Sequence, residues 1–372
     1  MSFLYENLLA ITWQQVAMWA IGSVLIYLAI KKDMEPSLLL PIGFGAILVN
    51  LPFSGAVDQL ISGALQEGPL STLYKAGIAN ELFPLLLFIG IGAMCDFGPL
   101  LSNPVMMLFG AAAQFGIFFV LCLASMFFPI NDAASIATIA AADGPTAIVV
   151  AEKLGSQYLG PIMVAAYSYM ALVPIIQPPV IKLLTSKKER QIRMDYEPKQ
   201  VSKITRILFP IIITVVSGII SPASVSLVGF LMFGNLIKEC GVLDSLNDTA
   251  QDALANIITL ILGITIASQM QADQFLQLDT LIILGLGLFG FVFDTAGGII
   301  FAKLLNLFLP KKINPMIGAA GISAFPMSGR IVHKLGLEED SQNFLLMHSM
   351  AVNVSGQIAS VVAGGLILSM FM

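Results

Sequence analysis

One carboxylate stands inside an apolar stretch of the chain, beside two residues that interrupt helices. The stretch IATIAAADGPTAIVVAEKLG covers residues 136–155, and Asp143 is followed directly by Gly144 and Pro145. Proline removes a helical hydrogen bond and clashes with the preceding turn, so a helix is expected to break here. A carboxylate at membrane depth costs at least about 2.5 kcal/mol on insertion scales and is by default a candidate functional residue.

The chemistry that these residue types favour is the binding of a small, hard cation. The Asp143 carboxylate, the nearby Thr146 hydroxyl and the carbonyls freed by a broken helix would together form an oxygen site that suits Na⁺ or H⁺. A second interpretation is that Asp143 only caps the helix that follows it, since aspartate is a favoured N-cap residue. The two interpretations are compatible.

A second apolar stretch is interrupted in a similar way. It covers residues 314–336, NPMIGAAGISAFPMSGRIVHKLG, and its break is expected around Phe325 and Pro326. Arg330 is the sharpest signal here, because arginine stays charged and matches a carboxylate bidentately. It could instead extend to the membrane interface from a helix end. The other polar candidates in the stretch are Asn314, Ser323 and Ser328.

Further polar residues stand in apolar runs, each with a structural alternative. A tyrosine in such a run usually lies at the interface or forms one hydrogen bond in the core, which applies to Tyr167 and Tyr169. Asn353 and Ser355 add oxygens to the last apolar run, where small polar residues also serve helix–helix packing. Asp294, in FVFDTAGG, could be a second cation ligand or could pair with a lysine.

Composition determines which elements must position these residues. The 372 residues are 57% hydrophobic and 11% charged, against roughly 25% charged in soluble domains, and the mean hydropathy is +0.89. Long apolar runs recur along the chain, which predicts an all-α polytopic membrane protein. The three cysteines lack a metal-type spacing and the glycines lack a Walker lysine, so no zinc cluster, nucleotide loop or nucleic-acid site is expected.

The chain divides almost in half at a basic stretch over residues 182–206, which the positive-inside rule places in the cytoplasm. The halves resemble each other at an offset of about 180 residues: AIVVAEKLG matches GRIVHKLG, and MALVPIIQ matches MAVNVSGQ. We therefore expect an internal duplication in which each repeat carries one broken helix. The expected parts are an extra span (1–32), repeat 1 (33–184, broken near 143–145), a linker (185–203) and repeat 2 (204–372, broken near 323–328).

The number of spans is left open between eleven and twelve. Five-span repeats on either side of a cytoplasmic linker would be inverted, whereas six-span repeats would be parallel. About eleven spans in two inverted repeats is the arrangement that we expect. Lys31 and Lys32 do not settle the orientation of the N-terminus.

Three segments carry a resemblance to a known family: AADGPTAIVVAEKLG, YSYMALVPIIQPPVIKLLT and NPMIGAAGISAFPMSGR. They resemble the β subunits of the sodium-pumping, biotin-dependent decarboxylases of oxaloacetate, methylmalonyl-CoA and glutaconyl-CoA. The resemblance covers nearly the whole chain, and the Asp-Gly-Pro-Thr segment with its downstream tyrosine is the most specific part. It implies a subunit that decarboxylates carboxybiotin, couples this step to Na⁺ export and consumes one proton from the outer side.

The resemblance also implies site residues. The family's essential aspartate and tyrosine fall on Asp143 and Tyr169, and Arg330 would act with them and, together with Ser323, bind carboxybiotin. The second-repeat set Asn, Gly, Ser and Arg falls on Asn314, Gly318, Ser323 and Arg330. The implied Na⁺ ligands are Asp143, Thr146, Asn314, Ser323 and Asn353.

The implied surroundings are those of a complex in the cytoplasmic membrane of a bacterium. Carboxybiotin would be carried by a partner, so biotin carrier and carboxyltransferase subunits, a small single-span membrane subunit and further copies of this chain are expected. The main alternative is a stand-alone Na⁺- or H⁺-coupled secondary transporter of an organic anion, which needs the same broken helices. An inert assembly subunit fits poorly with so many polar residues in the apolar runs.

Overall fold

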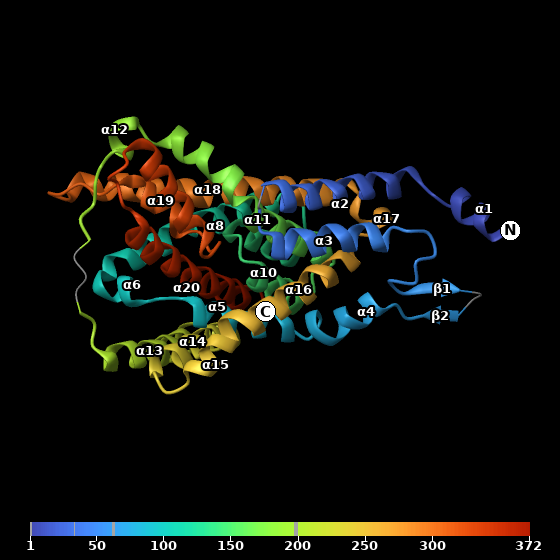
Figure 1. Cartoon of the computed structure of the whole chain (residues 1–372), viewed down its shortest axis with the longest axis horizontal. Coiled ribbons are helices and arrows are strands. Elements are labelled where there is room, and N and C mark those ends of the chain that lie inside the picture. Colours follow the sequence, from blue (N-terminus) through green and yellow to red (C-terminus); the bar gives the residue numbers. More distant parts are fainter. Residues whose placement is uncertain (1, 33, 62–63, 197–199) are drawn as a thin grey trace.

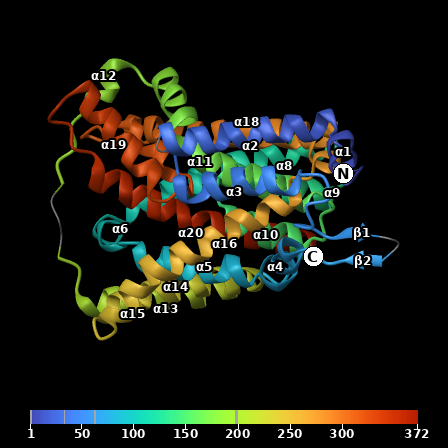
Figure 2. The same ribbon diagram turned by 45° about the vertical axis from the view of Figure 1, so that its right-hand side comes forward.

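The computed structural model describes the whole chain except residues 1, 33, 62–63 and 197–199. Helices make up most of the described part, and a small antiparallel hairpin, β1 (Gln59–Ile61) with β2 (Ala64–Gln66), projects from one end (Figure 1). The opposite end carries the short helix α12 (Lys187–Arg190) and helix α19 (Met327–Glu339). Most helices run between these two ends (Figure 2), as expected for an all-α protein that spans a membrane.

Eight helical segments in the described part are long and apolar enough to cross a membrane. They are α2 (Trp13–Lys32), α7 and α8 together with the turn before them (Pro104–Ala124), α11 (Leu159–Leu184), α13 (Lys203–Ile220), α14 with the turn before it (Pro222–Cys240), α15 to α16 (Asp244–Gln269), α18 (Leu278–Phe308) and α20 (Leu346–Phe371). A ninth candidate is the pair Pro69–Ile78 and Leu82–Met94, bent by 63°. The all-α polytopic class is confirmed; the count of eleven and the inverted arrangement stay predictions.

The remaining helices are shorter. They are α1 (Ser2–Leu9), α3 (Pro36–Val49), α4 (Pro69–Leu73), α5 (Leu82–Met94), α6 (Gly98–Ser102), α9 (Ile130–Ala137), α10 (Gly144–Lys153) and α17 (Ala272–Phe275). Within the longer segments, α7 covers Met107–Ala113, α8 covers Phe115–Ala124, α15 covers Asp244–Asp248 and α16 covers Ala255–Ile266.

Two segments are interrupted near the centre of the molecule. The first consists of α9, a 3₁₀ turn η3 (Thr138–Ala141) and α10, with Ala142 in the left-handed region at a φ of 52° and Asp143 as N-cap of α10. The second consists of the 3₁₀ helix η7 (Pro315–Gly321), an extended stretch and α19. The two interruptions touch, because the Ser323 backbone N–H donates to the Ala141 carbonyl at 3.1 Å.

Three long helices, α11, α18 and α20, surround the interruptions. Helix α18 packs on η3 and η7, and α20 packs on η7, α19 and α10; both views show α20 and α10 together in the middle of the molecule (Figures 1 and 2). Small residues allow the closest approaches. A Cβ atom on Gly298 of α18 would lie 2.0 Å from the Gly318 carbonyl oxygen of η7, so only glycine fits there.

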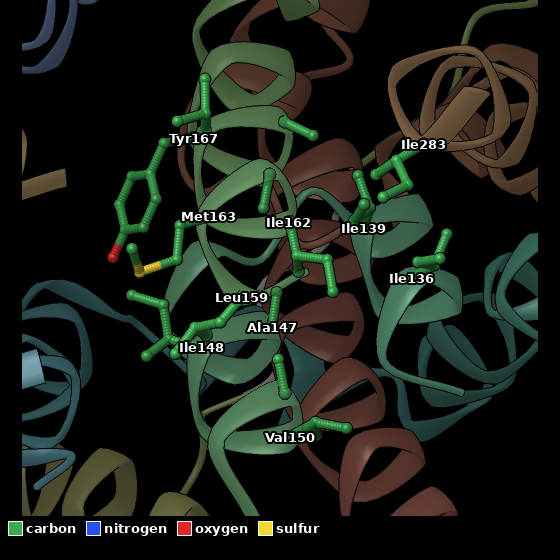
Figure 3. Packing of buried hydrophobic residues seen from close by; sticks show 14 of the residues in the cluster. Ile136, Ile139, Ala147, Ile148, Val150, Leu159, Ile162, Met163, Tyr167 and Ile283 are labelled. Atoms are coloured by element: carbon green, nitrogen blue, oxygen red, sulfur yellow. The ribbon is translucent and has the colours of Figure 1, made fainter. Parts of the chain in front are cut away.

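Apolar side chains fix the first broken segment against α11. Figure 3 shows Ile136 and Ile139 on one side of the break, Ile148 on the other, and Ile162 and Met163 on α11. All five are fully buried. Such close-packed contacts have few alternative arrangements, so the two halves of the broken segment are held in defined positions.

The linker that follows α11 is bound to the second half of the chain. Arg190 forms an ion pair with Glu339 at 2.6 Å, and Arg193 donates two hydrogen bonds to the Asp340 carboxylate, at 2.6 and 3.0 Å. The Asn314 side chain, just before η7, donates to the Arg190 carbonyl at 2.9 Å. The linker is therefore fastened to the residues that begin and end the second broken segment.

We predict that removing the Arg193 hydrogen bonds loosens the linker. Arg193 lowers the pKa of the Asp340 carboxyl below its ordinary value. A lowered folded-state pKa stabilises the bound linker above the usual value near 3.9, and this contribution is lost as pH falls through the folded-state value. Arg193→Met should therefore raise hydrogen exchange of residues 185–196 at pH 7, measured by mass spectrometry, with a smaller rise in Arg193→Lys. Unchanged exchange in Arg193→Met would show that this contact does not hold the linker.

Candidate functional site

Asp143 lies buried at the point where α10 begins. Its carboxylate Oδ2 accepts a hydrogen bond from the Thr146 hydroxyl at 2.9 Å and another from the Ser360 hydroxyl of α20 at 2.7 Å. The backbone N–H of Thr146 lies 3.4 Å from Oδ1, which is the N-cap contact that aspartate favours. Asp143 thus both caps α10 and presents a carboxylate to the neighbouring helix α20.

The second broken segment completes the surroundings of the carboxylate. The Ser323 hydroxyl lies 3.3 Å from Asp143 Oδ2 and is hydrogen-bonded to Ser360, and the Gln357 amide nitrogen lies 3.4 Å from the same oxygen. No lysine, arginine or histidine in the described part of the chain forms an ion pair with Asp143. A buried carboxylate is thus surrounded by neutral hydroxyl and amide groups alone.

One face of α20 supplies the polar contacts to both broken segments. Ser349, Asn353, Gln357 and Ser360 are spaced by four, four and three positions and therefore share a face, which we call the polar row of α20. All four are buried. Gln357 and Ser360 contact Asp143 of the first broken segment, whereas the other two contact the second.

Asn353 holds the uncoiled part of the second segment. Its amide nitrogen donates to the Ala320 carbonyl at 3.1 Å and to the Ile322 carbonyl at 2.8 Å, while its Oδ1 is buried without a hydrogen-bond partner. Gln177 of α11 acts in the same way from the other side, donating to the Ala319 carbonyl at 2.7 Å. Backbone groups freed by the break are thereby satisfied by side chains rather than by water.

Tyr167 is the tyrosine that faces the carboxylate region. Its ring lies directly over Gly144, where an added Cβ would come within 2.4 Å of it. The side chain is fully buried and its hydroxyl has no hydrogen-bond partner in the described structure. Figure 3 shows the ring projecting from α11. An unpaired phenol beside a buried carboxylate is an available proton donor.

Tyr169 points elsewhere. Two positions along a helix correspond to a rotation of about 200°, so Tyr169 lies on nearly the opposite face of α11 from Tyr167. Its hydroxyl donates to the Leu284 carbonyl of α18. The structure therefore brings Tyr169 to α18 and does not bring it to Asp143.

Two other residues expected at the site lie away from Asp143. Asn314 donates to the Arg190 and Ile192 carbonyls of the linker, at 2.9 Å each, and accepts from the Met316 backbone. Its side chain is therefore fully occupied at the far end of η7. Arg330 is exposed on α19, one turn beyond Pro326. The structure thus brings three of the expected residues into contact: Asp143, Thr146 and Ser323. Asn353 does not contact Asp143 but binds the Ile322 carbonyl, next to Ser323 in the chain. The expected residues that lie away from Asp143 are Asn314, Tyr169 and Arg330.

A cavity of about 210 Å³ opens onto the carboxylate. Its buried end is lined by Asp143, Tyr167, Ser323 and Gln357, and it extends to exposed residues such as Asn256 of α16. This volume is below the roughly 300–1,000 Å³ of small-molecule pockets. In this conformation the cavity accommodates an ion with a few waters, and a larger ligand would have to bind toward its mouth.

The donor set determines which chemistry is possible. One carboxylate, three hydroxyls and an amide are hard oxygen ligands, which suit Na⁺, Ca²⁺ or Mg²⁺ far better than transition metals. Within the described residues, no three histidine, cysteine, aspartate or glutamate side chains group together. A single negative charge balances a single positive one, so the arrangement favours a monovalent cation.

Sequence reasoning missed Ser360 and Gln357, and it preferred Tyr169 to Tyr167. The spacing of the polar row of α20 was an available signal, because polar residues every third or fourth position in an apolar helix mark one face. Asp143 could be recognised as a candidate because Gly144 and Pro145 interrupt the apolar helix directly after it. The choice between the two tyrosines had no signal in the sequence, because either face of α11 could have been the one turned to the break.

The fold and site together are those of an ion-handling membrane protein with paired broken helices. Comparison with known proteins narrows this class. Residues 14–371 match the family described as the Na⁺-transporting oxaloacetate decarboxylase beta subunit. The chain therefore belongs to this family, whose members are subunits of membrane-bound decarboxylases.

Relatives in the family are named as subunits of decarboxylases of different substrates. The chain is 48% identical to the methylmalonyl-CoA decarboxylase subunit beta of Propionigenium modestum, over 96% of this chain and 94% of that protein. It is 47% identical to the glutaconyl-CoA decarboxylase subunit beta of Acidaminococcus fermentans, over 98% and 95%. It is 44% identical to the probable oxaloacetate decarboxylase beta chain of Vibrio cholerae, over 99% and 100%.

We predict that Gly144→Ala disturbs the site through Tyr167. The added methyl would overlap the buried ring, and overpacking of this kind typically costs about 1–3 kcal/mol. Heat-induced unfolding of the purified protein should move to lower temperature. The matched control is Gly285→Ala on α18, where no atom lies within 4 Å of the added Cβ. Equal behaviour of the two variants would contradict the proposed packing.

Proposed function

We propose that this chain is the membrane subunit that decarboxylates carboxybiotin on a partner carrier and uses the reaction to export Na⁺, with consumption of a proton from the outer side. The proposal rests on the Asp143 carboxylate, which is buried between two broken helices and whose hydrogen-bond partners among the described residues are all neutral. Membership of a family of Na⁺-transporting decarboxylase subunits supports it.

Na⁺ is the cargo that the Asp143 surroundings fit. The hydroxyls of Thr146, Ser323 and Ser360 now donate to the carboxylate, and each can turn its lone pairs to a cation that approaches Asp143 Oδ2. Gln357 can offer its Oε1 in the same way. The cation would supply the positive charge that the buried carboxylate otherwise lacks, and binding there is favourable for this reason.

Carboxybiotin would approach from the mouth of the cavity. Glu35 and Ser37, at the start of α3, line the outer part of the cavity. The start of α3 faces the end of the molecule that carries α12 (Figure 1). The basic linker at that end is expected in the cytoplasm. Arg330, exposed one turn beyond the cavity-lining Pro326, carries a permanent positive charge that attracts the carboxylate of an incoming carboxybiotin.

The reaction itself needs a proton. Loss of CO₂ breaks the N–C bond and leaves the electron pair on the ureido nitrogen, which must be protonated. Tyr167 has a free hydroxyl beside Asp143, whereas Tyr169 is bonded to α18, so we assign the proton-donating role at the cavity to Tyr167 and a positioning role to Tyr169. Movement of the two broken segments against α11, α18 and α20 would then open the cation site outward.

The proposed setting is a complex in the cytoplasmic membrane of a bacterium. Biotin carrier and carboxyltransferase subunits would supply carboxybiotin from the cytoplasm, and a small single-span subunit and further copies of this chain would complete the assembly. The carboxyltransferase would select the acid whose carboxyl group is transferred to biotin. The names of the relatives, which cover three different acids, support this division of labour.

We predict that Asp143→Asn abolishes Na⁺-dependent decarboxylation of carboxybiotin by the complex in vesicles. The amide preserves shape and helix capping but removes the charge that balances the cation. Changes around a metal ligand commonly cost 10–100-fold in affinity, so loss of the charged ligand should weaken apparent Na⁺ affinity by at least about 100-fold. Glu67→Gln, an exposed carboxylate on the distant hairpin, is the control.

Normal Na⁺-stimulated activity in Asp143→Asn would reject the assignment. The same assay separates the proposal from a stand-alone anion transporter. A transporter moves Na⁺ with an anion but releases no CO₂ from carboxybiotin.

The two tyrosines should differ when each is replaced by phenylalanine. Tyr169→Phe removes one hydrogen bond to α18, worth about 1 kcal/mol, and should lower thermal stability while leaving apparent Na⁺ affinity unchanged. Tyr167→Phe should leave stability unchanged but lower the decarboxylation rate and alter its pH profile. If Tyr169→Phe alone altered the pH profile, the proton-donating role would return to Tyr169.

A further inference from the structure

A second carboxylate, Asp294 of α18, lies fully buried and outside the site described above. Its Oδ1 accepts a hydrogen bond from the backbone N–H of Gly116, at 2.5 Å, and its Oδ2 is buried without a partner. Gly116 lies in the first turn of α8, directly after the junction with α7. The close approach excludes a side chain there, because a Cβ on Gly116 would lie 2.4 Å from the Gly290 carbonyl oxygen.

Other oxygen atoms near this junction also lack partners. The Thr295 hydroxyl, next to Asp294 in the chain, and the Gln114 Oε1, at the residue between α7 and α8, are buried and unpaired. Phe293 stacks on Phe119 of α8 with ring centroids 4.2 Å apart. Buried oxygens without a partner are costly, so a cluster of them at one junction calls for a structural or functional reason.

No positive charge balances Asp294 in the described structure. None of the ion pairs among the described residues includes it, and the hydrogen bonds to its carboxylate come from backbone N–H groups of α8, at Gly116 and Ile117. Helices η3, η7 and α7, which pack on α18, carry no titratable side chain. The titratable residues on α8, α9, α11 and α18 itself are Cys122, Asp132, Tyr167, Tyr169, Lys182, Asp279 and Lys303.

The geometry favours a proton over a metal cation as the partner of Asp294. A helix N-terminus carries a partial positive charge, and the Gly116 N–H group at the start of α8 points at the carboxylate. This partial charge would repel a metal cation that approached Asp294. The same N–H stabilises the ionised form, whereas the burial of the side chain favours the neutral acid. The two tendencies oppose each other, so the group is able to change its protonation state.

Asp294 also lies between the contacts that α18 makes with the two broken segments. One turn earlier, an added Cβ on Gly290 would lie 2.5 Å from the Ala140 Cβ in η3. One turn later, Gly298 contacts Gly318 in η7. A change in how α18 packs against α8 at Asp294 would therefore alter the contacts of α18 with both broken segments.

We propose that Asp294 is a proton-binding site, separate from the cation site at Asp143, whose protonation sets the packing of the α7–α8 junction against α18. The coupling of this proton to Na⁺ export rests on the proposed function, whereas the binding of the proton does not.

Infrared spectroscopy of the reconstituted complex tests proton binding directly. The comparison is made in the Asp143→Asn background, so that the first carboxylate does not contribute. We expect a protonated carboxylic-acid band that titrates with pH in Asp143→Asn and is lost in the Asp143→Asn/Asp294→Asn double variant. Adding Asp273→Asn instead, which removes an exposed carboxyl, should leave the band unchanged. A band that persists in the Asp294 double variant, or its absence throughout in Asp143→Asn, overturns the proposal.

Transport tests the coupling. In proteoliposomes, the Na⁺ transport rate of the wild-type complex should depend on the pH of the outer side, and Asp294→Asn, which keeps the acceptor for Gly116, should lose this dependence. A wild-type pH profile in Asp294→Asn overturns the coupling. If the wild-type complex pumps no Na⁺, the proposed function fails, and the infrared titration still decides whether Asp294 binds the proton.

Discussion

In the described part of the structure, the Asp143 carboxylate is buried without a positively charged partner, and the arrangement of the surrounding helices follows from this burial. Asp143 can remain in the interior because hydroxyl and amide groups from two broken segments and from α20 converge on it. Such a group is costly in an apolar medium unless it is hydrogen-bonded, and it is best satisfied by a cation. The breaks and the polar row of α20 contribute groups to this environment directly, and the small residues of α18 let it pack closely against both broken segments.

The two halves of the chain contribute unequally to it. The first supplies the charge, through Asp143, and the second supplies Ser323, which lies 180 residues later and touches it. Between the two stand helices that do not break: α20 contacts both segments through side chains, and α18 contacts both through glycines. A scaffold that touches both interruptions provides a physical route by which a change at one affects the other.

The sequence allowed the fold class to be predicted, and it pointed to three residues, Asp143, Thr146 and Ser323, that the structure brings together. The reasons are physical. A long apolar run crosses a membrane as a helix, because a helix satisfies its own backbone hydrogen bonds. An acid beside Gly-Pro in such a run is costly, so it marks a candidate functional residue. Ser360 and Gln357 were missed because small polar residues in a helix have many explanations. Asn314 and Arg330 share a segment with Ser323, yet a 3₁₀ helix and a helical turn carry them away from Asp143. Which face of α11 meets the break depends on tertiary packing alone.

If both broken segments hold the same cation, a double-mutant cycle on equilibrium Na⁺ binding will reveal the coupling between them. Thr146→Val removes a donor from the first segment and Ser323→Ala removes one from the second. Two ligands of one ion should each weaken Na⁺ affinity and should couple by about 0.5–3 kcal/mol, the range found for residues that share a partner. Unchanged affinity in Ser323→Ala, or strictly additive effects in the double variant, would contradict a shared site.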